Sequence, residues 1–156
     1  MASFSTLREL HIANALRLAQ EDLDAARTLI AVENRFGAYH LQQCGEKLLL
    51  ALLTAEDLHV ERKDAHRLDV LLDKLPDANP FKQRFRPLTV LTVFATTYRY
   101  PKDGGRISPM PAQTQTTGWA DELGRLVDDA ARHFGVDLKA SDREPAARAQ
   151  PPRTGG

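Results

Sequence analysis

Proline is distributed along this chain in a way that restricts its first half to one kind of structure. All nine prolines lie at or after Pro76, so residues 1–75 contain none. The same half is rich in Leu, Ala, Glu, Gln and Arg, which have high helix propensity. Because proline is the residue that interrupts helices most strongly, residues 1–75 are expected to form long, unbroken helices.

Two such helices are predicted from apolar residues that recur every three or four positions. The pattern covers residues 7–32 and then residues 36–57. Only Glu33–Arg35 separate the two segments. A connection that short forces consecutive helices to pack as an antiparallel hairpin.

The prolines of the second half divide it into shorter elements. Asp64 is positioned to cap a third helix, which Pro76 ends. Residues 81–98 contain many β-branched side chains, which favour strands. A lone strand leaves its backbone unpaired, however, and no second candidate strand exists. We therefore predict a fourth helix over residues 81–98, kinked or restarted at Pro87.

A fifth helix is predicted over residues 117–134, with Thr117 as its cap and Gly135 at its end. Residues 139–156 contain no Leu, Ile, Val, Met or aromatic residue. A segment that buries so little apolar surface is expected to be a disordered tail. The predicted fold is thus a single all-α domain over residues 1–138, an up-and-down bundle of four to five helices.

The composition excludes several classes of protein. Lys plus Arg and Asp plus Glu both number 21, and the resulting net charge of zero does not fit a basic nucleic-acid coat protein. Cys44 is the only cysteine, so an intrachain disulfide and a cysteine-based zinc site are excluded. The start of the chain lacks the apolar run of a signal peptide, and no segment has the roughly 18 apolar residues of a membrane helix. A cytoplasmic protein without membrane contact is expected.

A row of polar residues on the second predicted helix is the first candidate site. His40, Gln43 and Lys47 share one helical face, with Glu46 beside them. These groups either line a pocket and bind phosphate, or form an internal network in which Lys47 pairs with Asp22 of the first helix. Buried polar groups need such partners, so the spacing alone favours the network.

Arg99, flanked by two tyrosines, is the second candidate. It lies at the predicted end of the fourth helix, within residues 80–108, whose net charge is +5. A cation at a helix end is stabilised by about 0.3–1 kcal/mol without any ligand. The alternative is a phosphate site formed with the nearby Lys102 and Arg106, because a guanidinium binds phosphate through two hydrogen bonds and aromatic rings stack on bases.

The remaining reactive side chains have simpler interpretations. His66, near the start of the third predicted helix, is interpreted as a capping or core hydrogen-bond partner, and Cys44 as a small buried apolar residue. The sequence contains no HExxH motif, no glycine-rich phosphate loop and no paired carboxylates. No metal or other cofactor is therefore expected.

Four segments together resemble the HEPN domain family (higher eukaryotes and prokaryotes nucleotide-binding). They are AQEDLDAARTLI at 19–30, AYHLQQCGEKLLLALL at 38–53, AHRLDVLLDKL at 65–75 and YRYP at 98–101. The resemblance covers residues 8–134 and implies a helical bundle that often forms a homodimer. Small members are frequently encoded beside a minimal nucleotidyltransferase, as one half of a pair that resembles a toxin–antitoxin system.

Some members of this family are metal-independent ribonucleases, which carry an Arg followed after four to six positions by a His at the end of a late helix. Arg99 occupies the expected place of that Arg, but no His occurs between positions 100 and 132. Arg35 and His40 have an Arg-x4-His spacing, but they lie at the start of the second helix. The nuclease needs a His to move protons and an Arg to stabilise the phosphorane, so the departure argues against nuclease activity.

The leading hypothesis is a non-catalytic module that binds a nucleotide, such as ATP, and acts with a nucleotidyltransferase partner. Arg99 and Lys102 are the predicted phosphate contacts, and His40, Gln43 and Lys47 are the predicted polar row near the pocket. One alternative is a ribonuclease toxin that cleaves RNA with Arg35 and His40. The other is a purely structural dimerisation module.

Overall fold

The computed structural model describes residues 4–154, and all regular structure in that range is helical. The elements in chain order are α1 (Phe4–Ala31), α2 (Phe36–Ala55), the 3-10 helix η1 (Arg62–Asp64), α3 (Leu68–Lys74), α4 (Phe81–Phe85), the 3-10 helix η2 (Arg86–Ala95) and α5 (Gln113–Phe134). The predicted all-α bundle is confirmed. None of these helices combines the length and apolar character that a membrane span needs.

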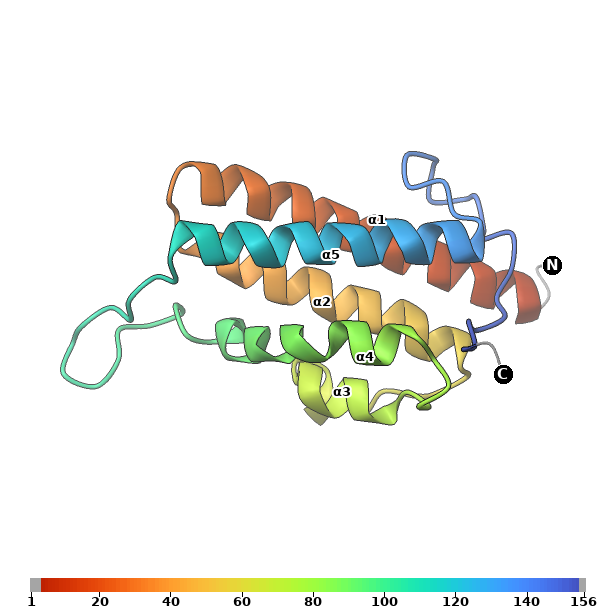
Figure 1. Ribbon diagram of the computed structural model, residues 1–156, viewed down its shortest axis with the longest axis horizontal. Helices are drawn as coiled ribbons and strands as arrows, with labels where there is room; N and C mark the ends of the chain where they lie inside the picture. The colour runs from red at the N-terminus through yellow and green to blue at the C-terminus, as the bar shows by residue number, and fades with distance from the viewer. Residues whose placement is uncertain (1–3, 155–156) are drawn as a thin grey trace.

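The helices α1 and α2 form the predicted antiparallel hairpin, and α5 lies along both (Figure 1). The shorter elements α3, α4 and η2 cover the side of α2 that faces away from α1. Gly37 lets the hairpin close, because a Cβ atom there would lie 2.9 Å from Cγ1 of Ile30. The core runs the length of the bundle and includes fully buried side chains from every long helix, among them Leu16, Leu48, Leu52, Phe85, Leu126 and Phe134.

The predicted fourth helix over 81–98 requires correction. It is an α-helix for only five residues and then becomes the 3-10 helix η2, with the change at Arg86 and Pro87. Pro87 has no N–H to donate to the preceding turn, so the α-helix is interrupted there. Its buried residues Leu88, Leu91 and Phe94 are spaced by three, which suits a 3-10 helix of about three residues per turn.

The starts of two other helices also differ from the prediction. Because η1 ends at Asp64 and α3 begins at Leu68, His66 lies in the turn before α3 and not inside a helix. The N–H of Leu68 is satisfied by the hydroxyl of Thr92, at 3.2 Å. Thr117 lies inside α5, which begins at Gln113. The last proline before α5 is Pro111, and a helix is free to begin as soon as proline no longer interrupts it.

Three helices, α1, α2 and α5, each end in a turn of the same type, a Schellman motif with one residue in the left-handed region. The residue is Gly135 after α5, with φ 66°, but Glu33 after α1 and Asp57 after α2, with φ 54° and 59°. In each motif the next N–H donates to a carbonyl five residues back, as in the 2.8 Å bond from Asn34 to Leu29. Two of the three turns therefore carry a side chain where glycine is the least strained choice.

The C-terminal segment contrasts with the disorder that its composition predicts. Residues 139–154 lie against the bundle, whereas residues 1–3 and 155–156 of the predicted domain and tail fall outside the described range. The buried guanidinium of Arg17 donates to the carbonyl oxygens of Asp137, at 3.0 Å, and Glu144, at 2.8 Å. These charged hydrogen bonds from Arg17 to main-chain oxygen atoms hold the segment against the bundle. They do so although the segment has little apolar surface to bury.

Candidate functional site

The predicted polar row on α2 divides between two hydrogen-bonded networks. In the first, the carboxylate of Asp22 on α1 lies 2.9 Å from Nδ1 of His40 and also pairs with the ammonium group of Lys47. The Asp22 side chain is only 12% exposed. The sequence-based pairing of Lys47 with Asp22 is therefore present, and this network joins α1 to α2.

The second network joins α2 to the turn before α3. Glu46 accepts hydrogen bonds from Gln42, at 3.0 Å, and Gln43, at 2.8 Å, and its other oxygen lies 2.8 Å from Nδ1 of His66. Gln43 is thus directed to a different carboxylate from the one that holds His40. The three side chains of the row do not converge on one ligand in this arrangement.

Arg99 lies just after η2, where aromatic side chains form a shallow pocket of about 220 Å³. Tyr98 stacks on Phe94, with ring centroids 6.0 Å apart, and meets Phe36 edge to face at 6.5 Å. The residues around this pocket are Phe36, Tyr39, Phe94, Ala95, Tyr98 and Arg99. Arg99 is exposed and forms no ion pair with any residue in the range 4–154.

A second guanidinium lies at the same end of the bundle. The Cζ atom of Arg35 lies 5.9 Å from the centroid of the Tyr98 ring. Arg35 also donates to the carbonyl oxygen of Ser108 at 3.4 Å, and Tyr98 donates to that of Pro109 at 2.9 Å. Burial raises the pKa of Tyr98, with Arg35 opposing that shift, so the phenol remains a hydrogen-bond donor at neutral pH.

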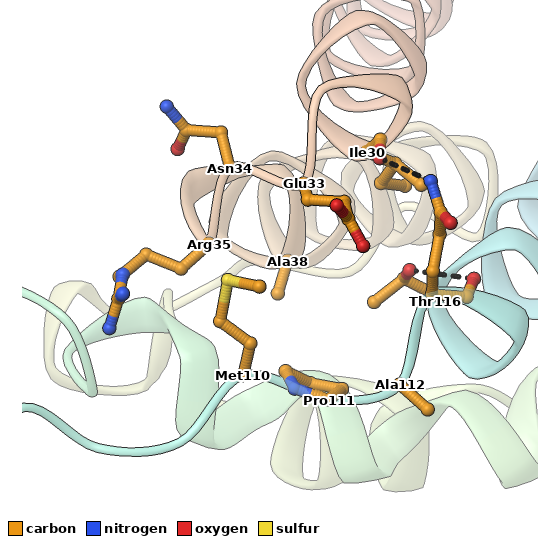
Figure 2. Close-up of a pocket in the computed structure, with 10 residues that line it drawn as sticks. Ile30, Glu33, Asn34, Arg35, Ala38, Met110, Pro111, Ala112 and Thr116 are labelled. Atoms are coloured by element: carbon orange, nitrogen blue, oxygen red, sulfur yellow. Dashed lines mark hydrogen bonds between the residues drawn. The ribbon is translucent and has the colours of Figure 1, made fainter.

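A pocket of about 240 Å³ opens next to Arg35, between the α1–α2 turn and the start of α5 (Figure 2). Figure 2 shows the Glu33 carboxylate directed into it, with Met110 and Pro111 on one side and Ile30 on the other. The wall near α5 is fastened by a 2.9 Å hydrogen bond from Gln113 to the carbonyl oxygen of Ile30. Sequence reasoning missed this pocket, because its two walls are far apart in the chain.

Lys102 does not line either of these pockets. It lies in the loop that extends beyond the end of the bundle before α5 (Figure 1). The loop turns back on itself through a 2.8 Å hydrogen bond from the Lys102 N–H to the carbonyl oxygen of Arg106. Among residues 4–154 neither Lys102 nor Arg106 has a carboxylate partner, so the loop carries two unpaired cations, and Lys102 lies outside both pockets.

Arg35 and His40, the pair considered for nuclease chemistry, contact different neighbours. Arg35 lies over Tyr98, whereas Nδ1 of His40 faces Asp22. The His40 ring meets Tyr39 edge to face at 5.3 Å, and Tyr39 lines the pocket of Arg99. The α1–α2 network and the Arg99 pocket therefore lie next to each other, with Tyr39 between them.

Other reactive groups offer little chemistry. No group of three or more His, Cys, Asp or Glu side chains within residues 4–154 is arranged to hold a metal ion. Cys44 is fully buried, and burial raises the pKa of its thiol far above the usual value. A thiol that stays protonated is a poor nucleophile, so the role of Cys44 is to pack in the hydrophobic core.

Comparison with known proteins identifies one family. A sequence profile of the HEPN domain matches residues 12–123, a range that runs from α1 into α5 and contains Glu33, Arg35 and Arg99. No curated protein and no solved structure matches the chain.

Proposed function

This chain belongs to the HEPN domain family, and from that premise we propose that it is a non-catalytic module that binds a nucleotide at the end of the bundle near Arg99. One observation carries the proposal. The exposed guanidinium of Arg99, without an ion pair in the described range, lines a pocket walled by aromatic rings, and the Cζ atom of Arg35 lies 5.9 Å from the centroid of the Tyr98 ring in that wall.

The chemistry of this corner suits a phosphate joined to a ring. A guanidinium donates two parallel hydrogen bonds to phosphate oxygens, and Arg35 and Arg99, which are both neighbours of Tyr98, provide a local positive field. The exposed Tyr100 lies beside Arg99 and is available to stack on a base. Lys102 is proposed to reach the outer phosphates from its loop, because its ammonium group has no carboxylate partner among residues 4–154.

Calorimetric titration with ATP and GTP tests this proposal. The Arg99→Ala variant is expected to bind at least about tenfold more weakly, since a charged hydrogen-bond pair contributes roughly 1.5–3 kcal/mol. Arg62→Ala is the matched control, because Arg62 is also exposed but lies in η1, in a different part of the chain. Equal affinity of the wild-type protein and the Arg99→Ala variant would refute the assignment.

His40, Gln43 and Lys47 have a supporting place in this proposal. Their side chains contact Asp22, Glu46 and Gln42, so they hold α2, which carries Tyr39, in position. Replacing His40 with Ala is expected to weaken nucleotide binding less than replacing Arg99 does. A larger loss for His40→Ala, with unchanged stability, would assign His40 to direct ligand contact.

We also propose a partner, a minimal nucleotidyltransferase, from the family resemblance. Such a protein would have exposed apolar side chains to contact: Phe36 and Met110, which line the two pockets, and Val90 and Val93 of η2. Co-expression with a nucleotidyltransferase encoded beside this chain is expected to give a complex that survives purification. Val93→Asp should weaken the complex, and Leu18→Asp, which changes an exposed apolar residue in a different groove on α1, is the control.

Ribonuclease activity is not proposed. Arg35 and His40 would have to act on one phosphate, but their side chains are held by Tyr98 and by Asp22, respectively. Purified protein is therefore expected to leave RNA intact in the presence of EDTA, and expression without a partner is expected to permit growth. Growth arrest that His40→Ala relieves would favour the toxin alternative instead.

A further inference from the structure

We propose that the pocket of Figure 2 holds the base of the nucleotide and that Glu33 selects guanine. This inference rests on the proposed function and adds the identity of the ligand. The pocket lies next to Arg35, which lines it, and Arg35 lies over the ring of Tyr98, which lines the pocket of Arg99. A single ligand can therefore place its base in one pocket and its phosphates by the guanidinium groups.

The walls of the pocket suit a flat ring. Met110 and Pro111 lie on one side of the pocket, and Ile30 and Ala38 of α1 and α2 complete its apolar walls (Figure 2). Most of the lining is therefore apolar. The volume of about 240 Å³ is sufficient for a purine. The hydrogen bond from Gln113 to Ile30, at 2.9 Å, keeps the two sides of the pocket together without using the Glu33 carboxylate.

Glu33 is the group that distinguishes the bases. Its carboxylate points into the pocket and forms no hydrogen bond or ion pair with any residue in the range 4–154. An ionised carboxylate only accepts hydrogen bonds, and its two oxygens accept two parallel donors. Guanine presents N1–H and the N2 amino group side by side on one edge, whereas adenine and cytosine present one amino group and uracil one N–H.

The backbone at Glu33 makes its side chain conspicuous. Glu33 occupies the left-handed position of a Schellman turn at φ 54°, where Gly135 serves the equivalent turn of α5. A glycine would relieve the strain at this position but would remove the one carboxylate found among the described residues that line the pocket. Asp57 occupies the same position after α2, with φ 59°, so the feature that marks Glu33 is the direction of its carboxylate into the pocket.

The charge around the pocket distinguishes a nucleotide from a simple amine. A cation would satisfy Glu33, but Arg35 lines the same pocket and Arg99 lies beyond Tyr98. Both repel an ammonium group and attract phosphate. A ligand with two neutral donors at one end and a phosphate at the other fits all three side chains.

Titration of the wild-type chain with GMP, IMP, AMP, CMP and UMP tests the inference. GMP is expected to bind at least tenfold more tightly than AMP, with IMP, which lacks the N2 amino group, between them. In Glu33→Gln the amide replaces one acceptor with a donor, so the preference for GMP over AMP should disappear. The control is Glu21→Gln, an exposed glutamate of α1 that lines a different groove, and it should retain the preference.

The outcomes separate this inference from the proposed function. Equal binding of GMP and AMP by the wild-type chain, or a GMP preference that persists in Glu33→Gln, would overturn the role of Glu33 while a loss of binding in Arg99→Ala would still support the phosphate site. Binding of guanosine but not of GMP would overturn the placement of phosphate at Arg35 and Arg99. If no nucleotide binds, both the proposed function and the base site are wrong.

Discussion

The residue that ends α1 provides a test of both stability and function in one substitution, Glu33→Gly. Glu33 has φ 54°, and its turn is closed by hydrogen bonds from Glu33 to the carbonyl oxygen of Ile30, at 3.0 Å, and from Asn34 to that of Leu29, at 2.8 Å. Neither bond uses the side chain. Glycine should therefore keep both bonds and remove only the steric conflict of Cβ in the left-handed region.

The expected gain follows from two opposing terms. In the folded state, an L-residue in the left-handed region costs roughly 1–2 kcal/mol, and glycine removes that cost. Glycine also gives the unfolded chain more conformational freedom, and this lowers the stability by about 0.4–1 kcal/mol. The variant should be more stable by about 0.5–1 kcal/mol, which for a domain of this size raises Tm by about 2 °C. The same variant should lose the preference for GMP.

Thermal and urea denaturation followed by circular dichroism measure this gain. Gly135→Ala provides the opposite case, because Gly135 has φ 66° and an added Cβ would lie 2.5 Å from Cβ of Ala147. That variant should be destabilised by more than about 1 kcal/mol. A Tm for Glu33→Gly equal to or below that of the wild-type protein would refute the reasoning, since it would mean that the Glu33 side chain stabilises the free chain.

Three further predictions concern the body of the bundle. The hydrogen bond from Arg84 and the interactions with Arg132 lower the pKa of Asp129. The contribution of ionised Asp129 to stability is therefore present above the ordinary pKa of aspartate and is lost as pH falls. The difference in Tm between the wild-type protein and Asp129→Asn should shrink below about pH 4. Burial and the raised pKa of Cys44 should protect its thiol from iodoacetamide until the protein unfolds, and rapid labelling of the native chain would contradict that burial. Arg17→Ala should cost about 2 kcal/mol and increase hydrogen exchange after residue 137, because two carbonyl oxygens lose a charged donor; unchanged exchange there would show that Arg17 does not hold the segment.

Local patterns explain why much of the fold was predictable. Apolar residues at helical spacing and the three-residue connection at Glu33–Arg35 were sufficient to predict the α1–α2 hairpin, and with it the pairing of Lys47 with Asp22. The spacing of Leu88, Leu91 and Phe94 by three was also visible in the sequence. The helix over 81–98 is predicted from the lack of a partner strand, and that argument does not distinguish an α-helix from a 3-10 helix.

The candidate site also has a part that local sequence predicts and a part that only the packing of distant segments creates. Arg99 was identifiable because its tyrosines and neighbouring cations are adjacent in the chain. The pocket at Glu33 was not, because it exists only where the α1–α2 turn meets Met110, Pro111 and the start of α5. The anchoring of Asp137 and Glu144 by Arg17 was equally hidden, since the donor and acceptors lie more than a hundred residues apart.

The all-helical class, the α1–α2 hairpin and the choice of Arg99 as a candidate follow from the chain itself, because periodicity, proline and short connections act over a few neighbouring residues. The second pocket, the orientation of the Glu33 carboxylate and the course of residues 139–154 depend on how distant segments pack. Such contacts are chosen by the fit of whole surfaces, which no window of the sequence contains.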